Sequence, residues 1–88
     1  MAVVSWESRA DRIDHEAAQF VWEQVAQDLA QEIATGALPP GSRLPSEAEL
    51  AVIYGVARMT VRRAISSLVE AGKVTRLHGR GTFVAQAD

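Results

Sequence analysis

Cysteine is absent from this chain, and so is any long apolar run. Without cysteine there is no disulfide framework, no thiolate metal ligand and no thiol nucleophile. No apolar run approaches the roughly 20 residues that a membrane-spanning helix requires, and residues 1–7 show neither the basic region nor the apolar core of a signal peptide. We therefore expect a cytoplasmic protein without a membrane partner.

Histidine is almost as scarce, with His15 and His78 as the only two. Neither stands at a spacing from other potential ligands or carboxylates that suggests a metal site or a catalytic triad. The pattern Gly79-x-Gly81 is too short for a dinucleotide-binding fingerprint. The sequence therefore predicts no enzyme, no metal and no cofactor. His15, which lies among acidic residues, is interpreted as a surface side chain.

The chain does have enough apolar sequence for one small domain, because its 88 residues are 48% hydrophobic and 23% charged. The net charge of −2 hides an uneven distribution: residues 1–36 carry −5 and residues 37–88 carry +3. Between Arg58 and Arg80, six basic residues stand with a single acid, Glu70. Since the local field governs attraction to a polyanion, this segment is a candidate nucleic-acid contact.

Residues 1–19 show little periodicity. A disordered leader, a short helix over about 8–18 and an arm that docks on a neighbour all fit them, and we favour a partly helical arm. Trp6 is open between packing on the core and lying at an interface. We divide the chain into this arm, a folded domain over residues 20–85 and a C-terminal tail over 86–88.

A helix is predicted from about Phe20 to Thr35. Its apolar side chains recur every four residues, namely Val21, Val25, Leu29 and Ile33. Trp22 widens this apolar stripe and is interpreted as a core residue. Gly36 ends the helix because glycine readily takes the left-handed conformation, and the turn Pro39-Pro40-Gly41 follows.

Ser46 and Glu49 form a capping box that starts a second, short helix. The Ser46 hydroxyl accepts from the amide three residues on, while the Glu49 carboxylate reaches back to the Ser46 amide. The apolar side of this helix consists of Leu50, Ala51 and Tyr54. Gly55 ends it after little more than two turns, and a third helix follows at once. Two short helices joined through one glycine are typical of a helix-turn-helix.

The third helix, over residues 57–71, has two unlike faces. The apolar face has three- and four-residue spacings and consists of Val61, Ala64, Ile65 and Leu68. The opposite face starts with Arg58, Met59, Thr60, Arg62 and Arg63. Guanidinium groups suit phosphates and guanine edges, and a helix in the major groove presents its N-terminal residues to the bases. A merely solvated surface is the alternative interpretation of this face.

Two β-like runs follow, over residues 73–77 and 81–85. Between them, His78-Gly79-Arg80 is a glycine-containing turn with a basic tip, so the two runs predict a β-hairpin. His78 is interpreted either as a turn residue or as a nucleic-acid contact.

Six blocks stand in order between residues 33 and 84: Ile33 with Gly36, Pro40–Glu47, Glu49-Leu50, Gly55-Val56, Arg58–Ala64 and Gly79–Val84. In this order they resemble the DNA-binding domain of the GntR family of bacterial transcription regulators, over residues 20–85. The resemblance implies an α+β fold, mainly α: a winged helix-turn-helix with a three-helix core and a small antiparallel β-hairpin as the wing.

The resemblance also implies sequence-specific binding of double-stranded DNA, usually a palindromic operator that a homodimer recognises. The third helix would be the recognition helix in the major groove. Its contacts by position would be Arg58, Thr60 and Arg62, with Met59 and Arg63 beside them. An arginine that reads guanine N7 and O6 contributes about 1–3 kcal/mol of discrimination.

Four more residues would contact DNA by the same resemblance. Ser46 would lie against a phosphate at the amino end of the second helix, where unpaired amides and the helix dipole favour an anion. His78, Gly79 and Arg80 would form the wing tip at the minor groove. An arginine there responds to the enhanced negative potential of a narrow groove.

Three features depart from the family pattern. Ala48 stands where arginine is common, and Ala57 stands where serine or threonine usually caps the recognition helix. Family members normally continue into a larger C-terminal effector-binding or dimerisation domain, whereas this chain ends just after the wing. We therefore expect no small-molecule effector site in these residues. A fragment and a stand-alone regulator both fit, with residues 1–19 as a candidate dimerisation segment in the second case.

Two other functions are alternatives. A winged helix that contacts proteins would leave the basic face solvated, and a DNA-binding protein of plasmid or phage maintenance would keep the DNA contact. Binding to DNA requires that Arg62 and Arg80 lie on the same side of the molecule. It also requires that their guanidinium groups are not locked into internal carboxylate pairs.

Overall fold

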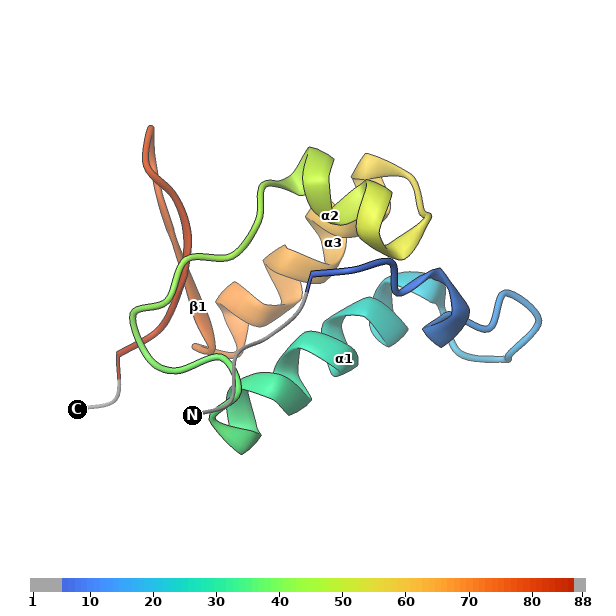
Figure 1. The fold of residues 1–88 in the computed structure, drawn as a ribbon, viewed down its shortest axis with the longest axis horizontal. Coiled ribbons are helices and arrows are strands. Elements are labelled where there is room, and N and C mark those ends of the chain that lie inside the picture. Colours follow the sequence, from blue (N-terminus) through green and yellow to red (C-terminus); the bar gives the residue numbers. More distant parts are fainter. Residues whose placement is uncertain (1–5, 87–88) are drawn as a thin grey trace.

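Residues 6–86, the part of the chain that the computed structural model describes, fold as three α-helices followed by a two-stranded antiparallel sheet (Figure 1). The helices are α1 (Val21–Thr35), α2 (Glu47–Tyr54) and α3 (Arg58–Glu70), and the strands are β1 (Val74–Leu77) and β2 (Gly81–Val84). This architecture is the predicted three-helix core with a hairpin wing. Within residues 6–86, every helix is too short or too polar to cross a membrane.

The helix α3 is central to the fold because it contacts α1, α2 and β1. Its predicted apolar stripe is buried at all four positions: Val61, Ala64, Ile65 and Leu68. From α1, Val25 and Leu29 are fully buried against it. Burial of each such side chain contributes about 1.5–3 kcal/mol, so the periodic stripes set which helix faces meet. The basic face of α3 is left toward solvent as a consequence.

The helices α2 and α3 begin and end at the capping residues that the sequence indicates. Ser46 caps α2, with its Oγ accepting from the Glu49 amide at 3.1 Å while the Ser46 amide donates to Glu49 Oε1 at 2.9 Å. Gly55 ends α2 with a φ of 67°, a left-handed conformation that glycine adopts without a steric penalty. Ala57 starts α3 without any side-chain cap, as the predicted departure from the family pattern implies.

Residues 42–44 join the wing to the helical core by pairing with β2. The sequence did not predict this segment as part of the sheet. Strand β1 pairs with β2 in the register Val74 to Val84, and the hairpin agrees with the prediction. Alongside β2, the Leu44 amide donates to the Thr82 carbonyl and the Val84 amide donates to the Ser42 carbonyl, both at 2.8 Å. Leu44, Val74 and Val84 are buried in the core, so the base of the wing is held firmly.

The segment before α1 packs across the helices and contains one short 3-10 turn, Ala10–Arg12, in place of a helix over 8–18. Arg9 is 2% exposed, and its amide donates to the Ile53 carbonyl of α2 at 2.6 Å. Ile13 belongs to the hydrophobic core. The division of the chain at residue 20 stays a prediction. Residues 6–13 nevertheless make contacts typical of an integral part of the fold.

Candidate nucleic-acid interface

The tip of the wing, the start of α2 and the start of α3 lie along one edge of the molecule (Figure 1). Between them is a groove of about 610 Å³. Five of the predicted site residues line this groove: Ser46, Arg58, His78, Gly79 and Arg80. The fold therefore brings together polar and basic groups from three elements that are distant in the sequence.

The other predicted residues surround a second hollow on α3. Met59, Thr60, Arg62 and Arg63 line it together with Trp22 from α1. Met59 is 68% exposed, and both arginines are exposed as well. The N-terminal turns of α3 thus present Arg58 toward the wing and the remaining residues toward α1.

Ser46 caps α2 with both its side chain and its backbone amide. Its Oγ accepts from the Glu49 amide, and its side chain and amide both bond the Glu49 carboxyl. The first turn of a helix also carries unpaired amides and the positive end of the helix dipole. Ser46, which lines the groove at this point, can therefore lie against an anion that approaches the start of α2.

The arginines of this edge differ in their partners. Among residues 6–86, no carboxylate forms an ion pair with Arg58 or Arg80, and both side chains are exposed. Arg62, in contrast, does form an ion pair with a carboxylate: its Nε donates to Glu47 Oε1 at 3.1 Å. The expectation that Arg62 has no carboxylate partner is therefore wrong. Glu47 lines the same groove as Arg80, so Arg62 and Arg80 do lie at the same edge.

The ion pair of Arg62 is accessible to solvent. The Arg62 side chain is 59% exposed and that of Glu47 is 25% exposed, and such a pair contributes only about 0–1 kcal/mol to stability. The pair uses Nε, and within residues 6–86 the two terminal nitrogens of Arg62 have no side-chain partner. These two nitrogens are the ones that form a fork toward a guanine edge or a phosphate.

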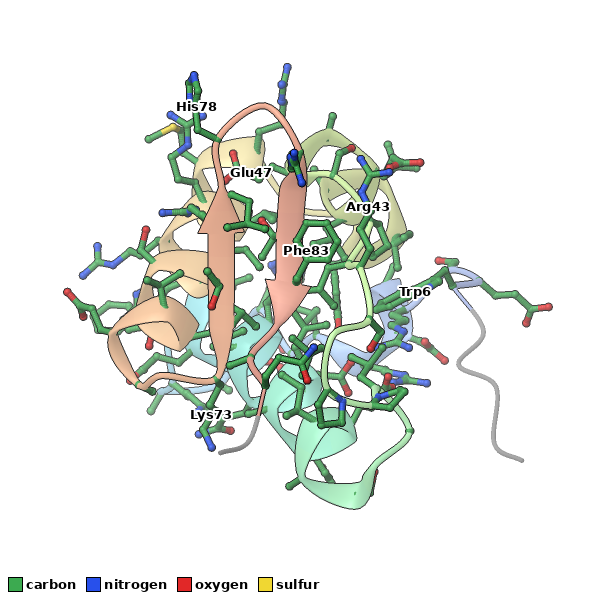
Figure 2. The ribbon with its side chains drawn as sticks, turned by 90° about the vertical axis from the view of Figure 1, so that its left-hand side faces the viewer. Trp6, Arg43, Glu47, Lys73, His78 and Phe83 are labelled. Carbon is green, nitrogen blue, oxygen red and sulfur yellow. The ribbon has the colours of Figure 1, made fainter. Side chains whose placement is uncertain are left out.

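Glu47 and Arg76 lie in this interface although the sequence did not single them out as site residues. Figure 2 shows Glu47 behind the hairpin, below the tip that His78 marks. Arg76 Nη2 donates to Glu47 Oε2 at 3.3 Å across 29 positions of sequence. The charge of Arg76 was visible in the basic segment, whereas its contact with a residue of α2 depends on how β1 packs.

Trp22 has a different place from the predicted one. It packs against the core but is only half-buried, and its ring stacks on Phe20 with centroids 6.4 Å apart. The Arg63 guanidinium lies over the same ring, 4.8 Å from its centroid. A cation–π contact at an exposed site is worth about 0.5–1 kcal/mol, which is enough to favour one orientation of Arg63. Trp22 therefore shapes the border of the α3 surface.

Arg43 is a further cation of the groove that was not singled out. It precedes Leu44 on the segment beside β2 and lines the groove with Arg58 and Arg80. A Cβ at Gly81 would lie 2.9 Å from Arg43 Nε, so the absence of a side chain there leaves space for this guanidinium. The resemblance blocks contained Arg43, but nothing local indicated its position beside the wing.

The two histidines are exposed on separate elements, His15 before α1 and His78 at the wing tip. Within residues 6–86, no three His, Cys, Asp or Glu side chains come together where they could hold a metal ion.

A helix-turn-helix whose third helix exposes a basic face, followed by a hairpin at the same edge, defines the winged helix-turn-helix class of DNA-binding folds. The family described as "Bacterial regulatory proteins, gntR family" matches residues 22–84. The chain belongs to this family, as the resemblance predicted.

Relatives and solved structures agree with this assignment. The HTH-type transcriptional repressor NagR of Bacillus subtilis (strain 168) is 47% identical over 66 residues, which are 75% of this chain and 27% of that protein. This chain therefore spans about a quarter of the length of the curated relatives it matches. The structure of YtrA from Sulfolobus acidocaldarius, a GntR-family transcription factor, is similar with a TM-score of 0.80 and 36% identity, over 86% of this chain and 80% of that one.

A third comparison is with a DNA complex. The structure of the AraR DNA-binding domain in complex with operator ORE1 has a TM-score of 0.75 and 36% identity, over 83% of this chain and 89% of that one. The fold of the present chain is thus that of a domain which has been solved on its operator.

Proposed function

We propose that this chain binds double-stranded DNA in a sequence-specific manner, as the DNA-binding part of a GntR-type transcription repressor. The observation that carries the proposal is the shared edge: the basic N-terminal turns of α3 and the tip of the wing flank one groove. An exposed helix and a hairpin placed in this way can enter adjacent grooves of a duplex.

The N-terminal turns of α3 read the bases in this proposal. Arg58, Thr60 and Arg62 contact base edges in the major groove, where guanine offers paired acceptors to a guanidinium. Met59 is exposed beside them and supplies apolar contact. Arg63, oriented by the Trp22 ring, is directed to the phosphate backbone.

The remaining residues position the protein on the duplex. Ser46 lies against a phosphate at the start of α2. His78, Gly79 and Arg80 enter or border the minor groove, and the positive φ of Gly79 (75°) gives the tip a conformation that other residues rarely adopt. Contacts of this kind fix the register on DNA and carry little direct sequence information.

A homodimer on a palindromic operator completes the proposal. Recognition of two half-sites by a symmetric dimer requires a spacing of about one helical turn, roughly 34 Å, or another spacing that the dimer sets. The name of NagR, a repressor, and that of the AraR DNA-binding domain in complex with an operator support an operator as the target. A cytoplasmic location and the absence of catalysis belong to the same proposal.

The test is to select bound duplexes from a random pool and to measure the dissociation constant of the enriched sequence over a series of salt concentrations. A DNA-binding protein loses affinity linearly in log salt, with a slope near −0.9 per phosphate neutralised. No enrichment and no binding at low salt would contradict the proposal and favour a winged helix that contacts proteins.

A further inference from the structure

Glu47 connects two arginines of the candidate interface. Its Oε1 accepts from Arg62 Nε of α3 at 3.1 Å, and its Oε2 accepts from Arg76 Nη2 of β1 at 3.3 Å. One carboxylate at the first turn of α2 therefore joins the recognition helix to a strand of the wing. Figure 2 shows Glu47 behind the hairpin, and its side chain is one of those that line the groove.

Arg76 makes two further hydrogen bonds, both with groups of α3. Its Nη1 donates to Ser66 Oγ and its Nη2 to the Arg62 carbonyl, both at 3.1 Å. The side chain is thus held by Glu47 of α2 and by two groups of α3, at the wall of the groove that it lines. Arg62 is held by one partner at Nε, which leaves its fork facing outward.

The contribution of these contacts to folding is small. The side chains of Arg62, Arg76 and Glu47 are 59%, 39% and 25% exposed, and ion pairs this accessible are screened by water and salt. A carboxylate on a surface that faces a polyanion also opposes binding through its charge. A group that contributes little to folding and repels DNA acts through what it does to the two arginines.

We infer that Glu47 is a positioning residue for sequence discrimination, an inference that rests on the proposed DNA binding. It orients Arg62 toward a base edge and withholds Arg76 from the phosphates. It thereby raises the ratio of specific to non-specific affinity. The negative charge of Glu47 and its ion pair with Arg76 both weaken binding to any duplex, whereas the orientation of Arg62 strengthens binding to the specific one. Discrimination of this kind penalises the wrong partner as well as favouring the right one.

The experiment compares Glu47→Gln with the unaltered chain on two duplexes of equal length, the enriched sequence from the random-pool selection and a scrambled one. Dissociation constants are measured over a salt series. The matched control is Glu70→Gln, which changes the net charge equally at the exposed end of α3, away from the groove. Thermal melting followed by circular dichroism verifies that each variant is folded.

Glu47→Gln should bind the scrambled duplex more tightly, with a salt slope steeper by about 0.9, because Arg76 loses its ion pair with Glu47 and its charge can then neutralise one phosphate. The ratio of specific to non-specific affinity should fall by roughly fivefold or more, as on loss of one base contact. Adding Arg76→Gln should return the slope to its original value without restoring the ratio. Glu70→Gln should leave the ratio unchanged.

Glu47→Asp separates position from charge. The shorter side chain keeps the charge but cannot span the same distances to Arg62 and Arg76, so the ratio should fall in this variant too. A ratio that stays at its original value in both Glu47 variants would overturn the inference. So would an equal loss of affinity on both duplexes. Failure of the unaltered chain to prefer any sequence would overturn the proposed function itself, and that result is read before any variant is compared.

Discussion

Arg9, a buried residue that precedes the three α-helices, connects several elements of the fold. Its guanidinium lies 2.9 Å from Asp28 Oδ2, 2.8 Å from Glu32 Oε1 and 4.5 Å from the centre of the Trp6 ring. Burial by itself lowers the pKa of Arg9, but hydrogen bonds with Glu32 and Tyr54 outweigh it, so the pKa lies above its ordinary value. The charged form is therefore the stable one in the fold.

Replacing Arg9 by methionine should lower the free energy of unfolding by about 3–5 kcal/mol, because it leaves two carboxylates without their buried partner. Urea unfolding measures the change. The control is Arg12→Ala, since Arg12 pairs with the same carboxylates but is 47% exposed, and its removal should cost about 0–1 kcal/mol. Equal effects of the two substitutions would show that the burial of Arg9 has no particular role.

A second prediction at the scale of residues concerns base contacts. Arg58→Ala should weaken binding to the enriched duplex by about 1–3 kcal/mol and relax the preference at one base position. Selection with the variant identifies that position. If Arg58→Ala weakens the enriched and the scrambled duplex equally, Arg58 contacts phosphate and not a base.

At the scale of elements, α2 depends on its cap. The backbone amide of Ser46 and then its side chain hold the pKa of Glu49 below its ordinary value. A carboxyl whose pKa is lower in the folded state stabilises the fold above its unfolded pKa, and this stabilisation is lost as the pH falls through the folded value. The capping box should therefore weaken on acidification.

The corresponding prediction is that the chain becomes less stable as the pH falls below about 4.5, the ordinary pKa of a glutamate side chain. Glu49→Gln should remove part of this dependence. Urea unfolding at a series of pH values measures it, with Glu16→Gln, an exposed residue outside the helices, as the control. An identical pH profile for Glu49→Gln and the unaltered chain would contradict the role of the cap.

The start of α3 offers a gain of stability. Ala57 has the extended conformation of an N-cap, with φ −68° and ψ 150°, but no side-chain acceptor. Ala57→Ser should supply that acceptor and raise the free energy of unfolding by about 1 kcal/mol. Ala34→Ser, at an exposed position in the last turn of α1, should instead lower it slightly, because serine is a weaker helix former than alanine. A lower stability for Ala57→Ser would mean that the helix start is already satisfied in another way.

At the scale of the whole molecule, the charge distribution determines how the chain meets a polyanion. Asp28 and Glu32 of α1 form ion pairs with Arg9 and Arg12, whereas the groove is lined by Arg43, Arg58 and Arg80. The net charge of −2 is therefore a poor guide to DNA affinity. The affinity depends instead on the electrostatic potential at the edge of the molecule that contacts the duplex.

Arg80→Ala tests this view of the wing. Binding should weaken by a similar factor on the enriched and the scrambled duplex, and the magnitude of the salt slope should fall by about 1, as expected when one phosphate contact is removed. Competition binding at several salt concentrations measures both quantities. A loss confined to the enriched duplex would assign Arg80 to base reading.

Much of the fold could be predicted because its signals are local. The stripe of α3, the capping box of Ser46 and the glycine-containing turn of the hairpin each depend on residues a few positions apart, and the structure has them where the sequence placed them. The extent of order before α1 and the half-buried position of Trp22 were not predicted in this way. Both depend on packing between elements.

Over residues 20–85, the sequence by itself determined which segments are helical, where they start and end, and which face of each is apolar, since helical period and turn chemistry act over single turns. Only the tertiary structure decided that Arg62 and Arg76 share the Glu47 carboxylate, 15 and 29 positions away. It likewise decided that Arg9 reaches Asp28 and Tyr54 across 19 and 45 positions. Ion pairs carry no periodic signal, so a charged residue in a sequence does not reveal its partner until packing brings the two together.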